Sequence, residues 1–304
     1  MNFSDLTTLK IGGPVKKVIV VKTTDDLIKN LTASPLPLHP YLIIGSGSNL
    51  LVSDQGFNGV ILKNEILGIE KNGNNLIVKS GTVLQDLVDF ANENGLAGLE
   101  TLAGIPGTVG GAIFGNAGAY GQTIVDCLES VRAIDPITYH LSRITKKECQ
   151  FEYRDSIFKR NDFIITEAVF SLTSSEPANL KQASLATIKK REVKYPPGIK
   201  CPGSFFKNIP QDMILPEILD KLPKKFVLFG KVSAGALLES VGAKGAKLGD
   251  IKIAPYHANL FINEGNGSAA DFYHLAKTYS QKVFDRHRIR LEPEVQLINL
   301  PKFN

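Results

Sequence analysis

The sequence of 304 residues contains no tryptophan, two methionines and three cysteines. Cys127, Cys149 and Cys201 form no CxxC pair and cannot all pair with one another, which argues against a disulfide framework and favours a reducing compartment. The five histidines show neither HxxxH spacing nor a mixed Cys/His ligand pattern. We therefore expect no metal site.

Long apolar runs and basic stripes are also missing. No segment approaches the ~18 uninterrupted apolar residues of a membrane-spanning helix, and the first residues show no basic stretch followed by an apolar one. We expect a cytoplasmic protein without membrane insertion. The net charge of +5 mildly favours anionic ligands, but lysines and arginines are dispersed, so we expect no nucleic-acid partner. A chain with 43% apolar and 21% charged residues is typical of soluble globular proteins of two or three lobes.

The apolar periodicity indicates mixed α and β structure without a repeat of fixed length. Ser233 and Ser268 each precede an apolar helical pattern and are typical N-caps. The patterns predict strands at 15–22, 41–44, 60–62, 76–78 and 261–263, and helices at 25–31, 83–94, 234–241 and 269–288.

Two segments are rich in glycine. Residues 45–51, GSGSNLL, follow the buried strand 41–44 directly, and residues 104–121 form a longer loop. Glycine allows positive φ and close approach of backbone N–H groups, which suits a pyrophosphate, but tight turns between short strands would explain the composition equally well. The first loop lacks the third glycine of the dinucleotide fingerprint, and no clear helix follows it, so we do not predict a Rossmann domain.

Three polar residues stand in distinctive strings: Arg154 in YRDSIFK (153–159), Ser204 in GSFFKN (203–208) and Glu294 in LEPEV (291–295). A guanidinium can bind a carboxylate bidentately, and a hydroxyl can donate a proton. Each residue also has a plain structural interpretation. Arg154 could form a surface ion pair with a neighbour such as Asp155, Ser204 could be a turn residue, and Glu294 could be a solvated carboxylate.

Taken in order, the strings GSGSNLL, GIPGTVGGA, NAGAYG, YRDSIFK, GSFFKN and EPEV resemble those of the UDP-N-acetylenolpyruvoylglucosamine reductases, flavoenzymes of bacterial peptidoglycan synthesis. The resemblance runs from residue 11 to residue 295. It implies an α+β fold: a two-lobed FAD-binding domain of the vanillyl-alcohol oxidase (PCMH) type, with lobes at 1–66 and 67–176, and a C-terminal substrate-binding domain at 177–304. The short interval between Phe158 and Ser204 is similar to that of the compact, type II form, which lacks a substrate-covering insertion and its gating tyrosine.

The resemblance also implies a reaction and its residues. NADPH would reduce a non-covalently bound FAD, and the enzyme would then reduce UDP-N-acetylglucosamine enolpyruvate to UDP-N-acetylmuramate. Arg154 and Glu294 would stabilise an enol or enolate, and Ser204 would supply the proton; Glu292 matches the family position less well than Glu294. We expect a monomer. The implied cofactor residues are Gly45, Ser46, Gly47, Ser48, Asn49, Leu50, Gly104, Ile105, Pro106, Gly107, Thr108, Gly110, Gly111, Asn116, Ala117 and Gly118. The implied substrate residues are Tyr120, Lys207, Asn208, His257 and Asn259, with a structural histidine as the alternative for His257.

Two other functions fit parts of the pattern. An FAD-dependent sugar or alcohol oxidase of the same fold often tethers its flavin through a histidine or cysteine of the N-terminal lobe, and His39, in the proline-rich stretch 35–40, is the one such residue before Cys127. A non-catalytic nucleotide-binding protein would keep the glycine loops. The joint presence of Arg154, Ser204 and Glu294 argues against it.

Overall fold

The structure is a computed structural model that describes residues 1–33 and 40–303, so His39 lies outside the described residues. The chain divides into two compact units, each built from several stretches of sequence. We call residues 1–15, 47–57 and 194–304 the terminal unit, and residues 16–46 and 58–193 the central unit. The expected division after residues 66 and 176 stays a prediction. Within the described residues, no helix has the length and apolar character needed to span a membrane.

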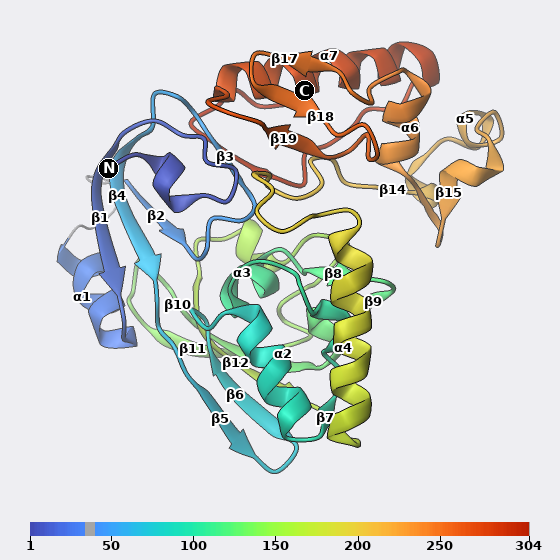
Figure 1. The fold of residues 1–304 in the computed structure, drawn as a ribbon. Coiled ribbons are helices and arrows are strands. Elements are labelled where there is room, and N and C mark those ends of the chain that lie inside the picture. Colours follow the sequence, from blue (N-terminus) through green and yellow to red (C-terminus); the bar gives the residue numbers. More distant parts are fainter. Residues whose placement is uncertain (34–39, 304) are drawn as a thin grey trace. The chain divides into compact units, whose positions relative to one another are not determined.

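Two sheets form most of the central unit (Figure 1). The larger is antiparallel, in the order β11-β10-β12-β6-β5, and the smaller has the order β1-β4-β2 with β2 parallel to β4. The larger sheet contains β5 Ile69–Asn72, β6 Asn75–Lys79, β10 Leu128–Ile134, β11 Leu141–Thr145 and β12 Ile164–Ser171, and the smaller β1 Val15–Val21, β2 Tyr41–Ile44 and β4 Phe57–Asn64. The middle strand β12 is almost continuously buried, as expected for a strand covered on both faces.

Helices cover these sheets in the central unit. Leu84, Leu87 and Val88 share one face of α2 and lie in the apolar core with the strands of the larger sheet. Helix α3 packs against β12 and β6, and α4 packs against α2 (Figure 1). The helices are α1 Thr24–Ala33, α2 Leu84–Glu93, α3 Val109–Phe114 and α4 Pro177–Glu192, with 3₁₀ turns at Glu100–Leu102, Ile124–Asp126 and Ile157–Lys159. Two short pairs join β7 Leu96–Ala97 to β13 Thr173–Ser174, and β8 Gly118–Ala119 to β9 Gln122–Thr123.

The terminal unit has its own apolar core, in which Phe205 lies at the centre of an aromatic cluster. Its ring centroid is 4.7 Å from that of Phe206 and 5.1 Å from that of Phe272 on α7. These edge-on contacts anchor the residues that directly follow Ser204. The elements are β3 Leu50–Val52, β14 Ile209–Pro210, β15 Val227–Leu228, β16 Lys231–Val232, β17 Lys247–Leu248, β18 Ile251–Ile253, β19 Phe261–Asn263, β20 Gln296–Ile298, α5 Pro216–Leu219, α6 Ala234–Ser240 and α7 Ala269–His287, with 3₁₀ turns at Phe3–Leu6, Gln211–Met213 and Lys224–Phe226.

Local signals located most helices correctly. Ser233 and Ser268 accept hydrogen bonds from Ala236 N and Asp271 N, and so cap α6 and α7 as predicted. The expectation of an irregular loop throughout 104–121 was wrong for its middle part. Thr108 caps the six-residue helix α3 there, and its Oγ1 accepts a hydrogen bond from Gly111 N.

Candidate functional site

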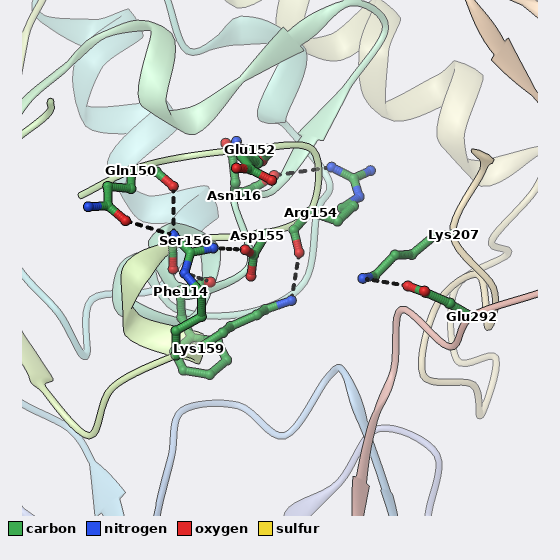
Figure 2. A network of polar contacts seen from close by, with 11 residues as sticks. Phe114, Asn116, Gln150, Glu152, Arg154, Asp155, Ser156, Lys159, Lys207 and Glu292 are labelled. Carbon is green, nitrogen blue, oxygen red and sulfur yellow. Dashed lines mark hydrogen bonds and ion pairs between the residues drawn. The ribbon is translucent and has the colours of Figure 1, made fainter. Parts of the chain in front are cut away.

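Arg154 is held against the glycine-rich segment within the central unit. Its Nη1 donates to Asn116 O at 3.2 Å and its Nη2 donates to Gly118 O at 2.8 Å. Figure 2 shows the guanidinium beside Asn116, and Lys159 Nζ donating to the Arg154 carbonyl at 2.7 Å. Asp155, the ion-pair partner suggested by the sequence, instead pairs with Arg160. The contacts orient Arg154 toward the loop that was predicted to bind the cofactor.

Asn116 carries a polar atom that the described residues leave unsatisfied. The residue is 6% exposed and has a φ of 42°, in the left-handed region that few non-glycine residues adopt. Its Nδ2 donates to Glu152 O at 2.8 Å, but its buried Oδ1 has no hydrogen-bond partner among the described residues. A buried acceptor without a partner costs about 1–3 kcal/mol. An N–H group of a ligand would satisfy it.

The two glycine segments approach each other within the central unit. A Cβ atom added to Gly45, at the end of β2, would lie 2.3 Å from Thr108 Oγ1, so only glycine fits there. Thr108 is the N-cap of α3, and Gly110 in its first turn also packs closely on Ser80, where an added Cβ would lie 2.9 Å from the Ser80 Cβ. The predicted cofactor residues Gly45 and Thr108 are therefore brought together. Gly47, Ser48, Asn49 and Leu50 belong to the terminal unit.

Ser204 and Glu294 lie on neighbouring backbone segments of the terminal unit. Glu294 N donates to Phe205 O at 2.7 Å, and Lys207 N donates to Glu292 O at 2.9 Å. Ser204 forms a bridge with Leu260 on its other side. Asn49, from the first glycine segment, joins the same group, because its Nδ2 donates to Glu294 O at 3.2 Å. Two of the three predicted catalytic residues are thus adjacent in this unit.

Several predicted substrate residues also support the backbone of the terminal unit. Asn259 Oδ1 accepts from Phe206 N at 2.9 Å while its Nδ2 donates to Phe206 O at 2.8 Å, so this buried amide fixes the backbone of the segment that carries Ser204. Asn208 Oδ1 accepts from Ala234 N at the start of α6. Lys207 Nζ lies 3.3 Å from the exposed carboxylate of Glu292 (Figure 2). Substrate binding by these residues stays a prediction.

His257 is a neutral imidazole at pH 7. Burial, with a smaller contribution from the positive charge of Lys194, lowers its pKa from 6.5 to about 4. Its Nδ1 accepts a hydrogen bond from Asn259 N at 3.1 Å, which assigns the ring proton to Nε2. The ring could donate one hydrogen bond to a ligand. It also has the structural role that the sequence left open.

Tyr120 and Tyr195 show contacts that the sequence patterns did not predict. Tyr120, in the central unit, is 46% exposed, and Lys190 Nζ lies 4.3 Å from its ring centroid. Tyr195, in the terminal unit, places its hydroxyl 3.0 Å from Ser204 Oγ. Neither Lys190 nor Tyr195 lies in a recognised string or on a periodic face. Their partners could be found only from the folded structure.

Comparisons with known proteins identify both parts of the chain. Residues 15–137 match a family described as FAD binding domain, and residues 195–298 match the UDP-N-acetylenolpyruvoylglucosamine reductase C-terminal domain. The chain is 39% identical to the UDP-N-acetylenolpyruvoylglucosamine reductase of Solibacter usitatus over 96% of this chain and 93% of that protein. It is 38% identical to the UDP-N-acetylenolpyruvoylglucosamine reductase of Chlamydia muridarum over 96% of this chain and 91% of that protein. The crystal structure of the reductase from Thermus caldophilus superimposes with a TM-score of 0.77 at 29% identity, over 98% of this chain and 97% of that one. The predicted fold class is confirmed.

Proposed function

The chain belongs to the UDP-N-acetylenolpyruvoylglucosamine reductase family, and we propose that it reduces UDP-N-acetylglucosamine enolpyruvate to UDP-N-acetylmuramate, with FAD as its bound cofactor and NADPH as the hydride donor. The observation that carries the proposal is the hydrogen bond from Glu294 N to Phe205 O, which sets Glu294 beside the segment of Ser204 in the domain that matches the family. The product is a peptidoglycan precursor, so we propose that the reaction takes place in the cytoplasm. We also propose that the enzyme acts as a monomer.

The residues of the central unit fit a flavin. Gly45 lets the end of β2 approach the cap of α3, which brings the two predicted cofactor segments together, and the unsatisfied Asn116 Oδ1 would accept the ring N–H of the isoalloxazine. We assign cofactor binding to the two glycine segments, as the sequence predicted. When bound by these segments, FAD would supply the hydride-transfer chemistry that links NADPH to C3 of the enolpyruvyl group.

The protein's own residues would stabilise the negative charge that develops on the substrate and would donate the proton to C2. Arg154, oriented by the carbonyls of Asn116 and Gly118, would bind the substrate carboxylate, where negative charge develops. Glu294 would stabilise the enol form with it. Ser204 would donate its hydroxyl proton to C2, completing the addition across the double bond. We assign Tyr120, Lys207, Asn208, His257 and Asn259 to binding or supporting the UDP-sugar.

Replacing Ser204 separates the two half-reactions. We expect Ser204→Ala to leave reduction of the flavin by NADPH almost unchanged and to slow reoxidation by the enolpyruvyl substrate by about 10²-fold or more, the scale of general acid catalysis. Stopped-flow absorbance of the flavin measures both steps. Ser280→Ala, within α7, is the matched control and should leave both rates unchanged. Equal slowing of the two steps in Ser204→Ala would contradict the assigned role.

A further inference from the structure

A phenol accompanies the proposed proton donor. The hydroxyl oxygens of Tyr195 and Ser204 lie 3.0 Å apart, a hydrogen-bonding distance at which either group can donate. Both side chains are partly buried. The pair lies within the terminal unit, where Ser204 also neighbours the segment of Glu294. Ser204 therefore has a second oxygen acid in direct contact.

Packing and backbone contacts hold both Tyr195 and Ser204 in place. The Tyr195 ring packs against a small apolar cluster of Cys201, Ala254 and Leu260. Leu260 also forms the backbone bridge with Ser204, so the cluster that the Tyr195 ring contacts is joined directly to the Ser204 backbone. The cluster is itself tied down, because Thr8 Oγ1 donates to Cys201 O at 2.8 Å. The Tyr195 hydroxyl is therefore positioned by packing before any substrate binds.

The chemistry of a serine acid explains why such a partner matters. An alkyl hydroxyl is a very weak acid, and transfer of its proton to carbon leaves a high-energy alkoxide unless another group replaces the proton. A phenol, with an ordinary pKa of about 10, is a much stronger acid. It can supply that proton over a single hydrogen bond.

Resting on the function proposed above, we propose that Tyr195 is a positioning and proton-relay residue that reprotonates Ser204 as Ser204 protonates C2 of the substrate. The Ser204 Oγ–H bond breaks as the C2–H bond forms. The Tyr195 O–H bond breaks as the Ser204 Oγ–H bond is restored. The partly buried tyrosinate then takes a proton from water, which returns the pair to its starting state. No oxidation change occurs in the relay.

The variant Tyr195→Phe tests the relay, because it keeps the ring that packs on the cluster of Cys201, Ala254 and Leu260 and removes only the hydroxyl. We expect flavin reduction by NADPH and substrate affinity, measured by flavin spectral titration, to stay unchanged. Reoxidation by the enolpyruvyl substrate should slow by about 10- to 100-fold. The matched control is Tyr256→Phe, which removes another, exposed phenol of the same unit and should leave both rates unchanged.

Two further readouts separate a relay from a structural role. In mixtures of H₂O and D₂O the wild-type reoxidation rate should depend on deuterium content along a curve, because two protons move, whereas the rate for Tyr195→Phe should follow a straight line. In a Ser204→Ala background, adding Tyr195→Phe should lower the reoxidation rate by less than a further twofold, because Tyr195 acts through Ser204. The relay would be overturned if the two substitutions lowered the reoxidation rate by independent factors, or if Tyr195→Phe were reoxidised at the wild-type rate. Neither result would contradict the reductase function. A wild-type flavin that NADPH reduces but the enolpyruvyl substrate does not reoxidise would overturn both.

Discussion

At the residue scale, the surroundings of His257 convert a group that normally titrates near neutrality into one that is neutral at pH 7 and takes up a proton only in more acidic solution. Burial disfavours the imidazolium, and the nearby Lys194 charge acts in the same direction, so the folded protein has a pKa of about 4 against 6.5 for the free side chain. Between these values the unfolded chain binds a proton that the folded chain does not. Stability therefore falls as the pH drops from 6.5 through 4.

His257→Asn should remove this component of the acid sensitivity. The Oδ1 of the new asparagine side chain can replace Nδ1 of the imidazole as the acceptor for Asn259 N, and an asparagine side chain does not titrate. We expect the loss of unfolding free energy between pH 7 and pH 5 to be smaller in the variant by about 1–2 kcal/mol, from 1.36 kcal/mol per pKa unit. Urea unfolding followed by circular dichroism at both pH values measures it. An identical loss in both proteins would show that His257 does not carry this proton.

Some residues of the candidate site could be predicted from the sequence, and others could be found only in the folded structure. Arg154, Ser204 and Glu294 could be named in advance because each lies in a distinctive string of neighbouring residues. Tyr195 could not, since its contact with Ser204 depends on the packing of its ring against a cluster that includes Ala254 and Leu260, distant in sequence, and this leaves no local pattern. The unsatisfied Oδ1 of Asn116 was likewise hidden, because it depends on which atoms the folded chain places around a residue with a backbone φ of 42°.

At the element scale, the close approach of β2 to the N-terminus of α3 organises the proposed flavin loops. Gly45→Ala would place a methyl group 2.3 Å from Thr108 Oγ1, and the helix cap would have to move. We expect flavin affinity, measured by fluorescence quenching, to fall by at least about tenfold, equivalent to 1.4 kcal/mol. The matched control is Gly115→Ala, whose added Cβ would meet Gly111 O at 3.6 Å, an ordinary contact, and flavin affinity should be retained.

A second substitution tests the cause of that loss. Thr108→Ala removes the two side-chain atoms nearest the new methyl group, at 2.3 and 2.9 Å. If the clash is responsible, Gly45→Ala should weaken flavin binding less in the Thr108→Ala background than in the wild type. Equal losses in both backgrounds would mean that the glycine serves another purpose.

Elements with local signals were predictable, and those that depend on distant partners were not. The caps Ser233 and Ser268 and the apolar period behind them located α6 and α7. Helix α3 was missed because glycine and proline dominate the residues around its start. The parallel pairing of β3 with β20 joins Leu50–Val52 to Gln296–Ile298 and has no signature in either segment alone. Helix α4 buries only Leu180 and Ser184, too few residues for an apolar stripe.

At the scale of the whole molecule, the distinction between a reductase and a flavin-tethering oxidase rests on how the cofactor is held. Gly45 brings the two glycine segments together, and Asn116 offers a hydrogen-bond acceptor, so the contacts that we assign to the flavin are non-covalent. Cys149 is buried in the core of the central unit, where burial raises its thiol pKa to about 12, so little of the thiolate needed for attachment forms.

We therefore expect the purified protein to release its flavin completely on acid precipitation, with FAD absorbance in the supernatant and a colourless pellet. The same reversibility predicts linkage between binding and folding. Free FAD at 100 times its dissociation constant should raise the unfolding free energy of the apoprotein by about 2.7 kcal/mol, and riboflavin, which lacks the pyrophosphate, should raise it less at the same concentration. Denaturant unfolding with and without each ligand measures both effects. A flavin that stays with the precipitated chain would identify a covalent tether and favour the oxidase, because no binding equilibrium could then release it.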